Sequence, residues 1–342
     1  MEYFAGLDVS LEETAICVVD GDGRTAGEAR VASEASAIAT WFEATRLRPA
    51  RLGLEAGPLA PWLQLGLEER GLPAVCIETR RMRSATLLMA VKTDRGDARA
   101  IAHAMRAGWY TAVHVKSMPS QELRLLLRNR KTLLEQRVRL DNVIRGTLKA
   151  FGIKLGRVSE ARFADRVAAL LEEHRPGLLD FVQPLLAVRL TLRRSYQALH
   201  RLVLRAVRDN PLCRRFMTVP GVGAVVALSV MTGIDDPRRF SRGRKVGVHF
   251  GLTPRKYASG EVDRNGAISR CGDAMVREAL FQAAHTLLTR VQRWSALKAW
   301  GMRLAKRRGL RRATVAVARK LAVILHRMWV SGEDFRWTAE AA

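Results

Sequence analysis

Four acidic residues stand at positions where a carboxylate is unexpected. Asp8 interrupts one apolar run and Glu55 ends another, while Asp94 and Asp97 lie three residues apart at the start of a helix-like segment. A carboxylate at the end of a buried strand is costly unless a cation meets it. Hard divalent cations such as Mg²⁺ prefer carboxylate oxygens, so these residues predict a magnesium site.

Four carboxylates can hold two Mg²⁺ ions. Two metals about 4 Å apart clamp the attacking and leaving oxygens of a phosphoryl displacement. Each acid alone has a plainer explanation, because Asp94 and Asp97 would also favour the dipole at a helix N-terminus. All four in this order favour the metal site.

The elements that must position these acids follow a recognisable order. We expect strands and helices, in chain order, at 3–10, 14–20 and 25–33 (strands), 34–47 (helix), 51–56 (strand), 59–70 (helix), 73–78 (strand) and 93–107 (helix). Three successive strands followed by alternating helix and strand predict a mixed sheet with helices on its faces. This is the order of the ribonuclease-H-like (RuvC-like) fold, with Asp8 on the first strand and Glu55 on the fourth.

A rival class shares this opening. Sugar-kinase and actin-like ATPases also begin with a strand that carries Gly-x-Asp and a hairpin, but they need Gly-rich loops to hold nucleotide phosphates. Residues 1–115 contain no such loops.

Two long helices with coiled-coil spacing follow. Their seam positions are Leu123, Leu126, Arg130, Leu133, Arg137, Leu140 and Ile144, then Val182, Leu185, Arg189, Leu192, Tyr196, Leu199 and Val203. Polar residues at such positions often set partner and register. The helices either pack only on each other or contribute to oligomerisation, and the persistence of the repeat favours the second interpretation.

The charge is unevenly distributed along the chain. Residues 1–115 contain 13 Lys and Arg against 15 Asp and Glu, whereas residues 116–342 contain 45 against 18. A cationic excess of this size indicates nucleic acid binding, although a merely soluble basic surface is the plainer alternative. The length of 342 residues allows three domains, which we place at 1–115, 116–210 and 211–335.

Other classes of protein are disfavoured. The four cysteines are scattered and the seven histidines lack ligand spacing, so zinc is not expected. The longest apolar stretch, 222–234, is too short to cross a bilayer, and no signal peptide is recognisable. We therefore expect a cytoplasmic protein without a membrane partner.

The third region has features of a mostly helical nucleic-acid-binding domain. Pro220-Gly221-Val222-Gly223 resembles a helix-hairpin-helix turn, in which Gly221 and Gly223 would let backbone N–H groups approach a phosphate. A cluster of cations follows that would neutralise phosphates: Arg238, Arg239, Arg242, Arg244 and Lys245.

Ser259 is a candidate nucleophile. It precedes Gly260 and follows Arg255 and Lys256, two cations that would bind DNA and stabilise an alkoxide and an attacked phosphate. A Ser-Gly pair is more often a simple turn, so the residues alone leave both interpretations open.

Several short motifs together resemble one family. They are Gly6-Leu7-Asp8-Val9-Ser10, Glu55-Ala56-Gly57, Lys92-Thr93-Asp94-Arg95-Gly96-Asp97-Ala98, Pro220-Gly221-Val222-Gly223, Gly251-Leu252-Thr253-Pro254 and Tyr257-Ala258-Ser259-Gly260. In this order they resemble the insertion-sequence-110-type DEDD transposases, also called bridge-RNA-guided recombinases, from about residue 3 to 330. Family members carry a RuvC-like nuclease domain, a coiled coil and a C-terminal transposase domain.

The resemblance implies roles by position. The four acids match the tetrad that binds Mg²⁺, and Ser259 matches the serine that forms a covalent phosphoserine link to DNA. It also implies a noncoding guide RNA that pairs with donor and target DNA, and a composite active site shared by subunits of a dimer or tetramer. Leu11 departs from a common Lys and Ala258 from a frequent second Ser, which leaves Ser259 as the unambiguous candidate.

Two alternatives remain beside this recombinase, which would act at the nucleoid. The first is a metal-dependent, Holliday-junction-type endonuclease that uses the same acids with water as nucleophile. The second is a non-catalytic nucleic-acid-binding protein descended from a nuclease, in which the acids would be dispensable.

Overall fold

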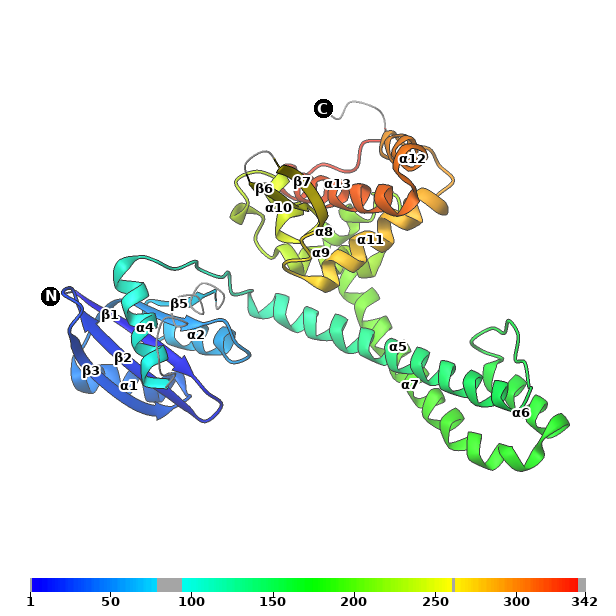
Figure 1. Cartoon of the computed structure of the whole chain (residues 1–342), viewed down its shortest axis with the longest axis horizontal. Helices are drawn as coiled ribbons and strands as arrows, with labels where there is room; N and C mark the ends of the chain where they lie inside the picture. The colour runs from blue at the N-terminus through cyan, green and yellow to red at the C-terminus, as the bar shows by residue number, and fades with distance from the viewer. Residues whose placement is uncertain (1, 79–93, 260–261, 338–342) are drawn as a thin grey trace. The chain divides into compact units, whose positions relative to one another are not determined.

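The computed structural model describes residues 2–78, 94–259 and 262–337. The chain divides into two compact units, Met1–Lys116 and Ser117–Ala342 (Figure 1). Residues Lys92, Thr93 and Gly260 of the family-like motifs lie outside the described residues.

The first unit contains the expected mixed sheet. Its described elements are β1 (Tyr3–Val9), β2 (Glu13–Asp20), β3 (Thr25–Ala32), α1 (Ala35–Thr45), β4 (Pro49–Glu55), α2 (Ala60–Glu68), β5 (Ala74–Ile77) and α4 (Asp94–Ala107). The strand order is β3-β2-β1-β4-β5, with β1, β2 and β3 antiparallel and β4 and β5 parallel to β1. This topology is ribonuclease-H-like, so the predicted fold is confirmed.

Helices cover both faces of this sheet. Alternate side chains of a strand point to opposite faces, so β1 contributes Leu7 to one core and Phe4 to the other. The first core packs against α1 and α2, through Phe42 and Leu63, and the second packs against α4.

Two glycines set the position of α4 on the sheet. Gly6 of β1 lies opposite Gly53 of β4 in the strand register. A Cβ atom on Gly6 would lie 2.1 Å from the carbonyl oxygen of Ala98, and one on Gly53 would lie 2.7 Å from the sulfur of Met105. Only glycine permits so close an approach of a helix, so this pair determines where α4 crosses the sheet.

The far end of α4 is tied to the β2–β3 turn. Arg106 donates a hydrogen bond from Nη1 to the carbonyl oxygen of Gly21 at 3.0 Å. This turn lies beside the start of β1, because Tyr3 pairs with Asp20. Therefore α4 runs antiparallel to β1, and its N-terminus lies toward the carboxyl end of that strand.

The second unit is helical apart from one hairpin. Its described elements are α5 (Met118–Ala150), α6 (Phe163–His174), α7 (Leu179–Arg208), α8 (Pro211–Phe216), α9 (Ala224–Ile234), α10 (Arg244–His249), β6 (Pro254–Ser259), β7 (Val262–Ile268), α11 (Ala274–Thr289), α12 (Ala296–Arg308) and α13 (Leu310–Ser331), with short 3-10 turns at Pro176–Leu178 and Pro237–Arg239. The mostly helical C-terminal region is as expected.

The predicted coiled-coil helices α5 and α7 pack on each other, and arginines lie in their seam (Figure 1). Arg189 is only 3% exposed, donates from Nε to Asp141 at 2.5 Å and stacks on Phe163 of α6. Arg130 donates to the Tyr196 hydroxyl at 2.6 Å and to His200 at 3.1 Å.

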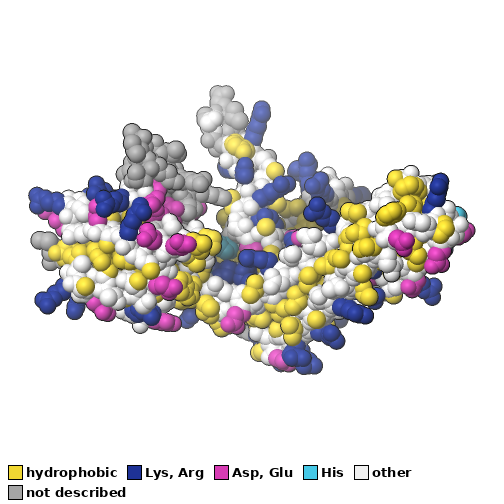
Figure 2. Space-filling view, turned by 90° about the horizontal axis from the view of Figure 1, so that it is seen from below, with side chains coloured by type: hydrophobic (Ala, Val, Ile, Leu, Met, Phe, Trp, Pro, Cys, Tyr) yellow, Lys and Arg dark blue, Asp and Glu magenta, His cyan; other side chains and the backbone are white. Residues whose placement is uncertain are grey.

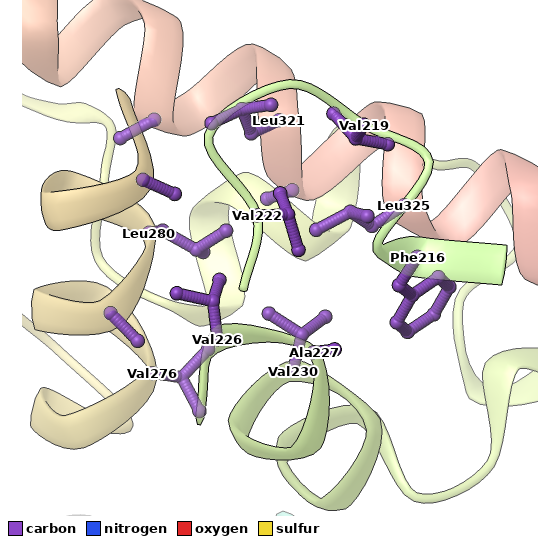
Figure 3. Close-up of a cluster of buried hydrophobic side chains, with 14 of the residues drawn as sticks. Phe216, Val219, Val222, Val226, Ala227, Val230, Val276, Leu280, Leu321 and Leu325 are labelled. Atoms are coloured by element: carbon purple, nitrogen blue, oxygen red, sulfur yellow. The ribbon is translucent and has the colours of Figure 1, made fainter. Parts of the chain in front are cut away.

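The base of this helical pair joins the C-terminal core. Val203 and Val207 of α7 belong to the same buried cluster as Phe216 and Leu321. Figure 3 shows the centre of this cluster, where the 216–222 loop packs between α11 and α13. Packing is therefore continuous across residue 210, where the sequence had predicted a domain boundary.

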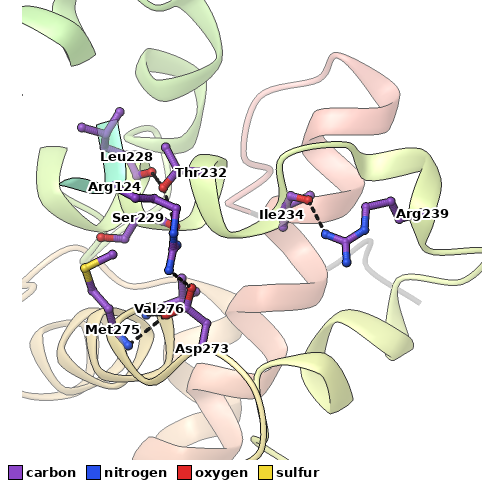
Figure 4. Close-up of polar contacts among 9 residues, drawn as sticks. All are labelled: Arg124, Leu228, Ser229, Thr232, Ile234, Arg239, Asp273, Met275 and Val276. Atoms are coloured by element: carbon purple, nitrogen blue, oxygen red, sulfur yellow. Dashed lines mark hydrogen bonds and ion pairs between the residues drawn. The ribbon is translucent and has the colours of Figure 1, made fainter. Parts of the chain in front are cut away.

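A buried ion pair ties α5 to α11. Asp273 caps the N-terminus of α11 by accepting hydrogen bonds from the backbone nitrogens of Met275 and Val276 (Figure 4). Its second oxygen lies 2.5 Å from Arg124 of α5.

No helix among the described residues is long and apolar enough to span a membrane.

Candidate nuclease and strand-transfer site

Asp8 and Glu55 come from neighbouring parallel strands. Leu7 pairs with Leu54 in the register, so the next residues, Asp8 and Glu55, lie side by side at the carboxyl ends of β1 and β4. Because side chains alternate along a strand, both acids share the face of the two glycines. That face is the one that α4 covers.

The first turn of α4 brings the other two acids. Both precede Ala98, which contacts Gly6: Asp94 by one helical turn and Asp97 by one residue. Asp8 and Asp94 line one cleft of about 340 Å³. We call the four acids, Asp8, Glu55, Asp94 and Asp97, the acidic edge.

Arg30 of β3 meets this edge. Its Nη2 lies 2.7 Å from Oδ2 of Asp94, and its Nη1 lies 3.9 Å from Glu13. Arg30 and Asp94 are 51% and 55% exposed, so the pair contributes at most about 1 kcal/mol and exchanges readily for another cation. Sequence reasoning missed Arg30, because only the strand register brings it to the cleft.

The acidic edge fits a divalent cation in the kind of ligand it offers. All its donors are carboxylate oxygens, which suit hard cations such as Mg²⁺ or Mn²⁺. Among the residues that the structure describes, no three acidic, histidine or cysteine side chains converge as a metal cluster. The acids therefore share an edge without forming a closed ligand set.

Ser259 ends β6 at the tip of the β6–β7 hairpin and is exposed. Tyr257 pairs with Arg264 of β7, and paired residues share a face, so Arg264 lies on the same face as Ser259. Lys256 lies on the opposite face. Arg255 is exposed at the base of the hairpin and donates to the carbonyl oxygen of Ser269 at 3.3 Å. Arg264 was missed because only pairing across the hairpin gives it this position.

The predicted basic cluster divides into two groups. Arg238 pairs with Asp236 at 3.1 Å, while Arg239 donates to the carbonyl oxygen of Ile234 at 3.0 Å (Figure 4). Burial lowers the pKa of Arg239, which caps the C-terminus of α9. The remaining members, Arg242, Arg244 and Lys245, are exposed, and no carboxylate of the described residues pairs with them.

Gly221 has a packing role that the sequence did not predict. Its φ is +87°, and a Cβ there would lie 2.4 Å from the carbonyl oxygen of Ala283 in α11. The missing side chain thus makes room for α11, and a phosphate contact of the Gly221 backbone stays a prediction. Gly223 is exposed at the N-cap of α9, with open space around its Cβ position, so a phosphate contact there stays a prediction.

Comparisons with known proteins define the class. A model described as "Transposase IS116/IS110/IS902 family" matches residues 213–300, and a DEDD transposase model of the IS110 type matches residues 5–153. The transposase for insertion sequence element IS1111A of Coxiella burnetii is 30% identical over 341 residues, covering 97% of this chain and 90% of that protein.

Two further similarities were found. The putative transposase y4pF/y4sB of Sinorhizobium fredii is 32% identical over 253 residues, covering 72% of this chain and 64% of that protein. The Thermus thermophilus RuvC structure aligns with 32% of this chain and 99% of its own length, at 16% identity and a TM-score of 0.26. This score is low, and the fold assignment rests on the strand order described above.

Fold and family together define a DNA transposase, an enzyme of the recombinase class. The chain belongs to the IS116/IS110/IS902 transposase family, so it is a transposase of an insertion sequence. A DEDD acid set on a ribonuclease-H-like sheet indicates a divalent metal.

Proposed function

We propose that this transposase cuts and rejoins DNA with Mg²⁺ held by the acidic edge and with Ser259 as the nucleophile. The observation that carries the proposal is the strand register, which supports a shared edge for Asp8 and Glu55 beneath the first turn of α4. Arg30 releases Asp94 when the metal binds, because both cations compete for the same carboxylate.

In this proposal the Ser259 hydroxyl oxygen attacks a DNA phosphorus atom. A P–O bond to one sugar breaks, the sugar oxygen takes up a proton, and the protein stays joined to the other DNA end as a phosphodiester. The reverse reaction on a new partner end completes strand exchange, so the bond energy is conserved. Bound Mg²⁺ would stabilise the negative charge on the phosphate oxygens during the attack. Arg264, on the face of Ser259, neutralises the same phosphate.

One gel experiment tests both parts. Wild-type protein, Ser259→Ala and Asp8→Asn are incubated with Mg²⁺ and labelled DNA carrying the ends of the element, then separated under denaturing conditions. Wild type should give a protein–DNA adduct, Ser259→Ala none, and Asp8→Asn at least about a hundredfold less. Matched controls are Ser241→Ala and Asp22→Asn, which change exposed residues of the same kinds.

Each failure has a distinct meaning. An adduct with Ser259→Ala would assign the nucleophile to another residue. Cleaved DNA without any adduct in wild type would favour water as nucleophile, as in the junction endonuclease. Full activity of Asp8→Asn would overturn the metal site.

We also propose that the α5–α7 pair mediates homo-oligomerisation, as a dimer or tetramer. Hydrophobic side chains gather along this pair in the space-filling view, and Val138 and Val143 of α5 are 45% and 48% exposed (Figure 2). An exposed apolar row of this kind is typical of an interaction surface. Val138→Asp with Val143→Asp should lower the mass measured by light scattering, whereas Val330→Asp on α13 should not.

A noncoding guide RNA and action at the nucleoid complete the proposal. The cationic excess of residues 116–342 supports polyanion binding without distinguishing RNA from DNA. Ribonuclease treatment should abolish recombination, and RNA transcribed from the flanking DNA should restore it. Unchanged recombination after ribonuclease treatment would remove the guide from the proposal.

A further inference from the structure

A groove of about 1620 Å³ lies between α11, α12, α13 and the base of the β6–β7 hairpin. These elements lie together in Figure 1. Pro254 and Ile268, at the two ends of the hairpin, form part of its wall. We call this cavity the α13 groove. Of the residues that the sequence had singled out, it contains Arg244 and two residues of a family-like motif, Leu252 and Pro254.

The lining of the α13 groove is strongly cationic. Seven arginines and one lysine line it, against a single carboxylate, Glu278. Glu278 is already engaged in an ion pair with Lys131 of α5. The groove therefore presents an almost uncompensated positive charge.

Three of these arginines cluster at the junction of α12 and α13. Arg308, Arg311 and Arg312 are all exposed, and no carboxylate within the described parts of the chain pairs with them. Arg308 ends α12 and the other two lie in the first turn of α13, and all three line the groove. Together they make a surface suited to successive phosphates.

The floor of the groove is apolar and partly aromatic. Phe281 of α11 and Trp300 of α12 are half-buried there, and the Lys320 ammonium lies 5.0 Å from the centre of the Trp300 ring. A DNA duplex presents phosphates and sugars to such a floor and gains little from it. An unpaired strand can place the flat faces of its bases on aromatic rings while arginines hold its backbone.

We infer that the α13 groove binds an unpaired segment of DNA, namely the strand that leads to the phosphate attacked by Ser259. Arg308, Arg311 and Arg312 hold its phosphates, and Phe281 and Trp300 contact its bases. The identity of the strand rests on the proposed function, because β6 leads from the groove to Ser259. The six residues of β6, Pro254–Ser259, span about 17 Å from first to last, so the segment in the groove lies several nucleotides from the cut.

The first test measures affinity for a fluorescent single-stranded oligonucleotide as a function of salt. All proteins carry Ser259→Ala, so that chemistry does not enter. The triple variant Arg308→Gln, Arg311→Gln and Arg312→Gln should bind at least about tenfold more weakly, and its log–log salt slope should fall by about 2. The matched control is Arg303→Gln, Lys306→Gln and Arg307→Gln, which removes the same charge from exposed sites of α12 outside the groove.

The outcomes distinguish DNA binding in the groove from a general effect of positive charge. A large loss in the groove variant with less than about a threefold loss in the control supports the inference. Equal losses in both triples, or binding by the groove variant at the wild-type level, overturn it. Tighter binding of duplex DNA, or of RNA of the same sequence, also overturns it.

The second test examines the bases. A strand that contains iodouracil is crosslinked by light and the modified peptides are mapped. Crosslinks should fall on Phe281 or Trp300, and not on Trp294, which is 60% exposed outside the groove. Crosslinks on Trp294 alone would contradict base contact in the groove.

Failure of the groove and failure of the chemistry are distinguishable. If the wild-type protein forms no serine adduct but the groove variant binds DNA more weakly, the proposed nucleophile is wrong and DNA binding in the α13 groove is supported. If the adduct forms but the groove variant binds DNA normally, the nucleophile is supported and the groove inference is wrong.

Discussion

The two units hold their key elements in place by different physical means. In the first, α4 is positioned by close apolar approach to the sheet at Gly6 and Gly53. In the second, α5 is held to its neighbours by buried ion pairs, of which Arg189 with Asp141 and Arg124 with Asp273 are the best enclosed. Close packing fixes the position of a helix accurately, and α4 must hold Asp94 and Asp97 at the acidic edge.

The difference also explains where the free charge lies. The carboxylates of the second unit that pair internally with arginine or lysine include Asp141, Glu160, Asp273 and Glu278. With these acids engaged, the cations of α10, α12 and α13 have few partners and remain available for polyanions. In the first unit acids and bases nearly balance, so it has no comparable excess of charge.

The largest effect on stability should come from breaking the ion pair between Arg189 of α7 and Asp141 of α5. Arg189→Ala removes one partner and leaves Asp141 without its cation, which costs about 3–5 kcal/mol in the free energy of unfolding. Urea denaturation of the purified protein measures this. The double change Arg189→Met with Asp141→Leu should recover most of the loss, and a double variant as unstable as Arg189→Ala would show that the charges themselves are needed.

Two buried thiols should make the stability of the first unit depend on pH in alkaline solution. Burial raises the pKa of Cys17 and Cys76 from 9.0 to about 11, so the folded first unit disfavours their thiolates. The contribution of the two thiols to the free energy of unfolding is constant below pH 9 and falls as the pH rises toward 11, because the unfolded chain loses these protons first. The decrease in the free energy of unfolding with pH should become smaller when both cysteines are changed to alanine. An unchanged pH dependence would mean that other groups cause it.

The steric contact of α4 can be broken by one methyl group. Gly6→Ala places a Cβ against the backbone of Ala98, and overpacking of this kind costs about 1–3 kcal/mol or more. Thermal unfolding followed by circular dichroism measures the loss. Gly21→Ala is the control, since nothing lies within 4 Å of its Cβ position. Equal stability of the two variants would remove the glycine pair from this explanation.

The smallest expected effect is a gain in the helical unit. Gly146 lies inside α5 with open space around its Cβ position, so Gly146→Ala should stabilise the helix by about 0.5–1 kcal/mol. The midpoint of urea denaturation checks this. A loss of stability would mean that Gly146 faces a partner in the assembled protein.

The sequence was sufficient for the elements and the order of the first unit. The alternation of apolar residues and the turn at residues 21–23 are local properties, and the strands and helices lie within a few residues of the expected ranges. It also located the acids of β1, β4 and α4, because a carboxylate that interrupts an apolar run is visible without a structure. The roles of these acids and of Ser259 remain predictions.

What depended on tertiary structure is which residues from distant segments meet. Arg30 reaches Asp94, and Arg264 the face of Ser259, only through strand register, which a linear pattern does not specify. Gly221 packs against α11, which a linear motif does not reveal, because the packing of a glycine depends on which distant segment approaches it. The α13 groove likewise exists only where three helices and a hairpin converge, whereas composition alone had already determined that residues 116–342 are strongly cationic.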